Sequence, residues 1–193
     1  MTKIDLASEL KDLEPRRGRF PWPNHEYVRG WGVFGLPFDS GHYLALRVFP
    51  ENDFAPYRTV WHRDPAGSWS IFADAPRLDI ACPRFYGAAC AVNAHARVDV
   101  RWTGPMSLHV TVDTPALAWT VEASETPHIG TLMPQRMYFI ESSSATLDGQ
   151  DLGNPAHSAD PIDIGGILRP TAKHSLSRSM YPTRCPATSP RVS

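Results

Sequence analysis

The four residues 64–67, Asp-Pro-Ala-Gly, constrain the fold of this chain more than any other stretch. Aspartate at the first position, proline at the second and glycine at the fourth favour a type I turn. A glycine in the left-handed conformation would complete a three-residue hairpin loop. The sequence therefore predicts two strands within 57–73, in which Arg63 pairs with Trp69 and Trp61 pairs with Ile71.

The predicted hairpin has two faces, because successive side chains of a strand point to opposite sides of the sheet. One face is expected to carry Tyr57, Thr59, Trp61, Arg63, Trp69 and Ile71. The other is expected to carry Arg58, Val60, His62, Ser70 and Phe72. Both faces mix apolar bulk with polar groups, whereas a sheet that is covered on one side only would show a cleaner division.

Composition excludes several classes of protein. The chain has 193 residues, enough for one domain with a good core, and 19 prolines, which favour short strands and turns over helices. Its net charge of -1 gives no broad field to attract nucleic acid or anionic lipid. No stretch approaches the ~20 apolar residues of a membrane span, and the N-terminus lacks the apolar run of a signal peptide. We expect a cytoplasmic protein with no nucleic-acid partner and no integral membrane segment.

Motifs for metal, cofactor or nucleophile chemistry are missing from the sequence. The three cysteines, Cys82, Cys90 and Cys185, are an odd number without a CxxC pair, which predicts free thiols. The eight histidines form no HxH or HExxH pair, so we expect no metal site. No GxSxG, P-loop or dinucleotide fingerprint is present, and we expect no cofactor.

The chain before the central hairpin predicts one helix and a first hairpin. Residues 5–14 form the helix, with Asp5 as its cap and leucines 6, 10 and 13 on one stripe. A first hairpin follows around 39–41. If Phe38 pairs with His42, its inward face collects Gly32, Phe34, Leu36, Leu44, Leu46 and Val48.

After the central hairpin, the sequence predicts a short strand over 78–82 that ends at Pro83, then a corner of small residues over 84–89. Residues 96–121 alternate cleanly and predict a three-strand meander with one wet face. Its inward residues are Ala96, Val98, Val100, Trp102, Leu108, Val110, Val112, Leu117, Trp119 and Val121. Residues 130–142 could supply one or two more strands, and 148–149 is a turn candidate.

About eight strands in sequential hairpins predict an all-β fold with one short N-terminal helix. The expected architecture is an antiparallel up-and-down β-barrel, lipocalin-like, or a strongly curved sandwich. We divide the chain into a helix and extended lead-in over 1–26 and a single β-barrel domain over 27–170. The basic tail, 171–193, has little apolar material and is expected to be disordered.

Three segments carry a resemblance to a known family: GWGVFGLPFDSGHYLALRVF, YRTVWHRDPAGSWSIF and the meander that ends in LAWTV. In strand order, tryptophan placement and hairpin texture, residues 27–142 resemble the lipocalin-like, calycin-type domains of the hydroxyneurosporene synthase and AttH-like group. Members of that group usually contain two such barrels, and this chain has room for one. The resemblance implies the fold class and an apolar ligand, and it implies no catalytic residue.

Aromatic and basic residues are the candidates for a binding site. Tryptophans 31, 61, 69, 102 and 119 come from several predicted strands, and they would either fill a core or line the interior of a barrel. The predicted ligand-binding residues are Trp61, Trp69, Trp119, Tyr57, Arg63, Arg84 and Tyr86. Arg47, Arg58 and Arg63 could together clamp a carboxylate, or they could be surface cations paired with nearby aspartates.

His62 is the candidate for acid–base chemistry, because an unperturbed histidine titrates near neutral pH. The alternative is a histidine that is hydrogen-bonded within a half-buried sheet. Three functions stay open: a barrel that binds an apolar or amphipathic small molecule, a hydratase- or isomerase-type enzyme for an unsaturated apolar substrate, and a packed interaction module without a ligand. The sequence favours the first and leaves open whether any catalysis occurs.

Overall fold

The computed structural model describes residues 5–11, 16–17, 28–129, 136–156 and 166–169, and these form a mostly β structure. The helical elements are α1 (Leu6–Lys11), η1 (Leu78–Ile80), α2 (Pro83–Tyr86) and η2 (Gly87–Ala89). The first strands are β1 (Arg16–Arg17), β2 (Val28–Pro37), β3 (Tyr43–Asn52), β4 (Tyr57–Arg63), β5 (Trp69–Asp74) and β6 (Val92–His95). They are followed by β7 (Val98–Trp102), β8 (Ser107–Val112), β9 (Leu117–Ile129), β10 (Arg136–Leu147), β11 (Gln150–Asp151) and β12 (Gly166–Arg169).

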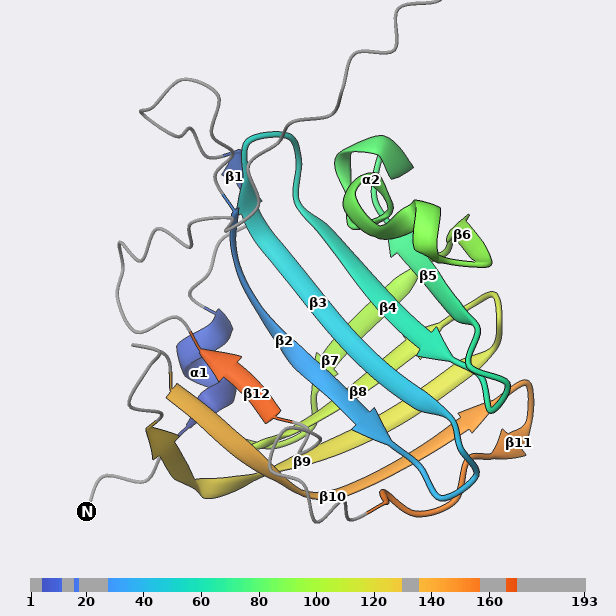
Figure 1. Ribbon diagram of the computed structural model, residues 1–193. Coiled ribbons are helices and arrows are strands. Elements are labelled where there is room, and N and C mark those ends of the chain that lie inside the picture. Colours follow the sequence, from blue (N-terminus) through green and yellow to red (C-terminus); the bar gives the residue numbers. More distant parts are fainter. Residues whose placement is uncertain (1–4, 12–15, 18–27, 130–135, 157–165, 170–193) are drawn as a thin grey trace, which may run out of the picture.

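One strongly curved sheet contains all the described strands. Its main path runs β6-β5-β4-β3-β2-β12-β10-β9-β8-β7, and β1 and β11 pair at its side with β3 and β10. Neighbours on the path are antiparallel except β5 and β6, which are parallel. Figure 1 shows the sheet folding over, so that the layer of β2–β5 crosses the layer of β7–β10.

The predicted all-β class and short N-terminal helix are confirmed. Strands β6 and β7 are the two ends of the path, and within the described residues they are not paired with each other. A closed ring of backbone hydrogen bonds is therefore not shown. The described strands are consistent with a curved, sandwich-like arrangement of two layers (Figure 1).

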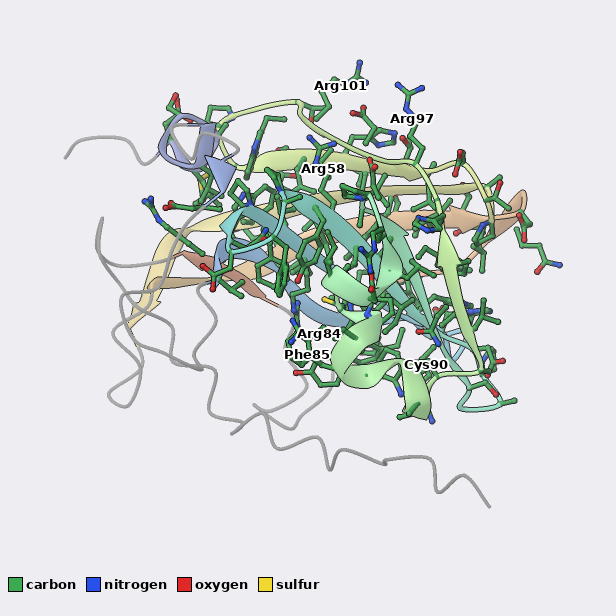
Figure 2. The ribbon with its side chains drawn as sticks, turned by 90° about the horizontal axis from the view of Figure 1, so that it is seen from above. Arg58, Arg84, Phe85, Cys90, Arg97 and Arg101 are labelled. Carbon is green, nitrogen blue, oxygen red and sulfur yellow. The ribbon has the colours of Figure 1, made fainter. Side chains whose placement is uncertain are left out.

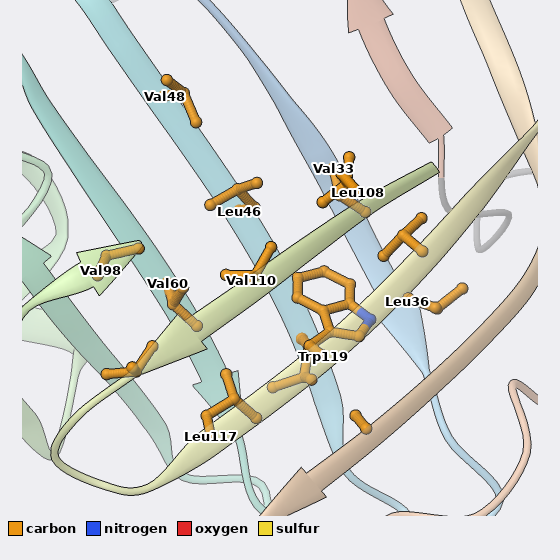
Figure 3. Packing of buried hydrophobic residues seen from close by; sticks show 14 of the residues in the cluster. Val33, Leu36, Leu46, Val48, Val60, Val98, Leu108, Val110, Leu117 and Trp119 are labelled. Atoms are coloured by element: carbon orange, nitrogen blue, oxygen red, sulfur yellow. The ribbon is translucent and has the colours of Figure 1, made fainter. Parts of the chain in front are cut away.

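The main core lies between the two layers, with Trp119 near its centre (Figure 3). The predicted meander supplies half of it, since its pairs Val98–Val112, Val110–Trp119 and Leu108–Val121 form as the alternation indicated. The facing side comes mainly from β2 to β5, with further residues from α1 and β10. Its buried residues include Trp31, Val33, Leu36, Leu44, Leu46, Val48, Val60 and Phe72.

The central hairpin forms in the predicted register. Arg63 lies opposite Trp69, and Trp61 lies opposite Ile71. Gly67 adopts a φ of 94°, and its amide donates to the carbonyl of Asp64 over 2.9 Å, as the turn chemistry requires. The order of residues in the turn was therefore sufficient to fix the pairing of the two strands.

The two faces of this hairpin bury their side chains in different places. Val60 and Phe72 point into the main core between the layers. The face with Trp61 and Ile71 points outward, where residues 78–90, which we call the cover segment, pack over it as part of a second and smaller core. This second core contains Tyr57, Ile71, Ala73, Ala81 and Cys82. The mixed composition of both faces thus reflects cover on both sides of the sheet.

The predicted strand over 78–82 is wrong. Residues 78–80 form η1, and Pro83 stands in the first turn of α2. Proline is well tolerated there, because the amide that it lacks has no partner within the helix. The predicted corner over 84–89 is α2 and η2, and the chain then enters β6, a short strand that the sequence analysis did not anticipate.

The first hairpin turns as predicted, with the amide of Phe38 donating to the carbonyl of His42 over 2.8 Å. Between Val33 and Leu36 the register shifts, because β2 advances three residues while β3 advances two. The residues of β2 before this shift therefore face the opposite side of the sheet from the predicted one. Val33 pairs with Leu46 in the core, while Gly32 pairs with Arg47 and does not belong to the inward face as predicted. A side chain at Gly32 would collide with the carbonyl of Leu46, so this close approach of two backbones requires glycine. The side chain of Phe34 lies outside the described residues.

Helix α1 begins as predicted, because the carboxylate of Asp5 accepts the amide of Ser8 over 2.9 Å. Leu6 and Leu10 are buried in the main core. The turn at 148–149 is confirmed by positive φ angles of 48° at Asp148 and 80° at Gly149. Cys185, the lead-in over 18–26 and the tail over 171–193 lie outside the described residues, and the division of the chain into domains stays a prediction.

Candidate functional site

A pocket of about 470 Å³ opens between the two layers, where β3 ends and β4 begins. Five strands, the β3–β4 connection and helix α1 contribute to its wall, so it lies where the two layers diverge. The lining residues are Leu10, Trp31, Val48, Pro50, Pro56, Tyr57, Arg58, Asp74, Val100 and Trp102.

Two tryptophans form the aromatic part of this wall. Trp31 on β2 and Trp102 on β7 come from opposite layers, and their ring centroids lie 5.6 Å apart with a tilt of 36°. Trp31 is buried and Trp102 is half-buried. Both belong to the set of tryptophans considered from the sequence, but neither was placed among the predicted ligand-binding residues.

Two charged side chains stand beside this apolar wall, and both bind the backbone of β7. Arg58 donates from Nη1 to the carbonyl of Val98 over 2.9 Å, and a carboxylate oxygen of Asp74 accepts the amide of Val98 over 3.3 Å. Arg58 and Asp74 are directly opposite each other on β4 and β5. Figure 2 places Arg58 between the two layers, while Arg97 and Arg101 point away from the fold. The two side chains thus join one layer to the edge of the other.

Most of the predicted ligand-binding residues lie on the outer face, away from this pocket. The indole of Trp61 makes edge-to-face contacts with Trp69 at 6.3 Å and with Tyr86 at 5.1 Å. The Trp61 indole also donates to the hydroxyl of Thr59 over 3.2 Å. Arg63 lies on the same face, opposite Trp69. The structure therefore brings these predicted residues together, but on the side of the sheet that carries the cover segment.

The remaining predicted residues are dispersed. Arg84 is exposed on the cover segment and lies over the rings of Phe54 and Phe85, at 4.9 and 5.1 Å from their centroids (Figure 2). Trp119 is 0% exposed in the main core. Tyr57 contributes to the pocket wall, although its ring packs against Phe49 on the outer face at 5.0 Å.

The three arginines that could have clamped one carboxylate are separated by the sheet. Arg58 points to the inner face and Arg63 to the outer face of β4, because an odd number of positions divides them. Arg47 lies on the outer face opposite Thr59, and its Nη1 donates to the carbonyls of Val33 and Leu46 over 2.7 and 3.0 Å. Burial lowers the pKa of Arg47 from its ordinary value. Arg47 and Arg58 bond to different backbone carbonyls, and the three arginines do not form one anion site.

His62 lies at the opposite end of the inner face from the pocket, bonded to His42. His42 Nδ1 and His62 Nε2 are 2.8 Å apart, and the two rings are nearly parallel, with centroids 5.0 Å apart. The centroid separation is close to the nitrogen–nitrogen distance plus the two ring radii, so the rings lie edge to edge and share one proton. A bridging metal ion would need bonds of about 2 Å to each nitrogen, which this separation is too short to allow in line.

The protonation of His62 is restrained by its surroundings. Burial, and then the neighbouring His42, lower the pKa of His62 below its ordinary value, while Asp64 and Asp148 oppose the shift. Two imidazolium rings would present two N–H groups to each other across this contact. The geometry is that of a hydrogen-bonded histidine pair in a half-buried sheet, which is the alternative to an acid–base role considered from the sequence.

Two of the three cysteines lie in the described part of the chain. Cys82 and Cys90 are free, and burial raises the pKa of both thiols. Across the described residues, no group of three or more His, Cys, Asp or Glu side chains is placed to hold a metal ion. None of the helices in this part of the chain is long and apolar enough to cross a membrane.

No protein family, curated protein or solved structure matches this chain in the comparisons with known proteins. The resemblance to calycin-type domains therefore stays a prediction.

Proposed function

We propose that the protein binds an apolar or amphipathic small molecule in the pocket between the two layers. The observation that carries this proposal is the aromatic wall formed by Trp31 and Trp102 around a space of about 470 Å³. Ligand sites occupy ~300–1,000 Å³ and combine mostly apolar walls with a few placed polar groups. Arg58 and Asp74 supply such polar groups at one side of the pocket. Leu10, Val48 and Val100 supply further apolar surface.

The proposal differs from the expectation drawn from the sequence in the residues that it uses. Of the predicted ligand-binding set, Tyr57 is retained, while Trp61, Trp69 and Tyr86 belong to the outer face. The kind of ligand is unchanged. The binding site moves to the side of the sheet that faces the second layer.

A titration with a fluorescent fatty-acid or retinoid probe tests the proposal, with two tryptophan variants as a matched pair. Trp102→Ala removes part of the pocket wall, and losing the burial of an aromatic side chain should weaken probe binding by about 10- to 100-fold. Trp69→Ala removes an indole of similar exposure from the outer face, and it should leave the dissociation constant within about twofold.

Two results would contradict the proposal. If the parent protein binds no apolar probe, the pocket is not a ligand site. If Trp69→Ala weakens binding while Trp102→Ala does not, the ligand binds on the outer aromatic face that the sequence indicated.

A further inference from the structure

The edge of β7 that faces the pocket presents backbone groups that pair with no strand among the described residues. Strands of an antiparallel pair alternate between residues that exchange hydrogen bonds and residues whose backbone groups point away. Thr103 donates to Ser107 over 2.9 Å and Asp113 donates to Arg97 over 3.2 Å, so the odd-numbered residues of this stretch bond to β8. The amide and carbonyl of Val98, Val100 and Trp102 consequently point to the opposite edge.

This edge diverges from β5 along its length. At Ala96 the amide donates directly to the backbone carbonyl of Ala73 over 3.1 Å. At Val98 the gap is wider, and the side chains of Arg58 and Asp74 bridge it. At Val100 the chain has reached the pocket, and among the described residues no strand or side chain bonds to its outward amide or carbonyl.

The series Ala96, Val98, Val100 shows what this edge accepts. Where the gap is narrow it takes a backbone group, and where it is wider it takes one acceptor and one donor from side chains. Val100 offers the same pair, one N–H and one C=O on the same side of the strand, beside the indoles of Trp31 and Trp102. A group that matches this pair must carry a donor and an acceptor that point the same way, as the N–H and C=O on either side of one Cα do in a neighbouring strand.

We propose that the pocket selects apolar molecules that contain an N-acylated amino-acid amide, and that the N–H and C=O on either side of its central carbon pair with the backbone of Val100 as a neighbouring strand would. The ligand carbonyl accepts from the Val100 amide, the ligand N–H donates to the Val100 carbonyl, and the apolar parts contact Trp31 and Trp102. This selectivity rests on the proposed function, because it assumes that the pocket holds an apolar ligand.

The test compares two matched ligands for their ability to displace the fluorescent probe. N-Decanoylglycine butylamide carries this amide unit, and 2-(butylamino)-2-oxoethyl decanoate is the matched ester, in which oxygen replaces the glycine N–H and the facing carbonyl is kept. The amide should displace the probe at about five- to tenfold lower concentration, the difference that one additional hydrogen bond makes. Hydrogen exchange at the Val100 amide should slow when the amide ligand is bound, whereas exchange at Asp99, already bonded to β8, should not change.

A protein variant provides the second measurement. Val100→Pro removes the outward N–H and leaves the ladder to β8 intact, because that N–H does not take part in it. It should weaken both ligands by a similar factor, and by more than it weakens the probe, which loses only the apolar contact of the Val100 side chain. Asp99→Pro is the control for damage to the strand, since it removes an amide that bonds to β8.

The outcomes separate this inference from the proposed function. Equal displacement by amide and ester, with exchange at Val100 unchanged, overturns the inference while the pocket still binds apolar molecules. If neither ligand nor probe binds, the inference is overturned together with the proposed function. A preference for the amide together with protection of Val100 supports it.

Discussion

The stability of a variant that lacks the Trp119 indole tests whether the space around this residue, between the two layers, is packed core or ligand site. Trp119 is 0% exposed and packs against residues of both layers (Figure 3). Trp119→Ala should therefore leave a closed void, and large-to-small changes of this kind cost about 3–5 kcal/mol of unfolding free energy.

The hydrogen bonds of the indole place the expected cost in the upper part of that range. Trp119 Nε1 donates to the hydroxyl of Ser143 over 2.8 Å, and that hydroxyl donates to the carbonyl of Thr120 over 2.8 Å. Removing the indole deprives Ser143 of one incoming bond but leaves its own donated bond in place. The additional loss is that of one ordinary hydrogen bond, about 1 kcal/mol, rather than of a buried donor without a partner.

Urea denaturation followed by circular dichroism measures this cost, with Trp102→Ala as the comparison. Trp102 borders an existing pocket and is half-buried, so its removal should cost about 1–2 kcal/mol, less than a fully buried ring. Because 5 kcal/mol is close to the whole stability of many domains, Trp119→Phe serves as a milder variant with an expected loss of about 2 kcal/mol.

Two findings would refute this reasoning. The first is that the two alanine variants lose the same stability, because the main core would then be no better packed at Trp119 than at the pocket wall. The second is that a Trp119 variant loses probe binding without losing stability. That result would restore Trp119 as a ligand-binding residue, as the sequence analysis expected.

Three further predictions follow from local features. The pKa of His62 is lower in the folded state than in the unfolded chain, so the unfolded chain binds more protons below the ordinary pKa of about 6.5. The unfolding free energy should therefore fall as pH falls below that value. Denaturation curves of His62→Gln should show a weaker dependence of stability on pH. Gly67→Val, at a φ of 94°, should cost more than about 1 kcal/mol of unfolding free energy, whereas Gly104→Val, at a glycine without positive φ, should cost less; equal losses would contradict the assigned turn. Asp74→Ala should speed hydrogen exchange at the Val98 amide and cost about 1 kcal/mol, and unchanged exchange would mean that the carboxylate does not hold β7.

The sequence was sufficient to predict pairing wherever a turn or a clean alternation determined it. The residues at 64–67 set the register of Trp61 and Trp69, and alternation placed Trp119 on the inward face of the meander. It was not sufficient to predict which face of the central hairpin meets the second layer. Both faces carry large apolar side chains, and the choice depends on the cover segment. Its helix α2 begins at Pro83, a residue that in the sequence also indicates the end of a strand.

The candidate pocket was harder to predict for a related reason. Trp31 and Trp102 lie far apart in the sequence and meet only because β2 and β7 lie in opposite layers. A shift of register between Val33 and Leu36, which no residue pattern indicated, determines which side chains of β2 face inward. The signal that could have identified Trp102 was its inward position in the meander, but that position alone does not distinguish core from pocket.

The two ends of the sheet path are consecutive in the chain, with only Ala96 and Arg97 between β6 and β7. The entropic cost of closing a loop grows with its length, so a two-residue link keeps this cost small when the two ends come back together after they separate. Transient separation of β7 from β4 and β5 would break the contacts at Val98 but leave the β7–β8 ladder intact. We expect this separation to occur as local opening, at a free energy well below that of global unfolding, and to give molecules from solvent repeated brief access to the space beneath β7.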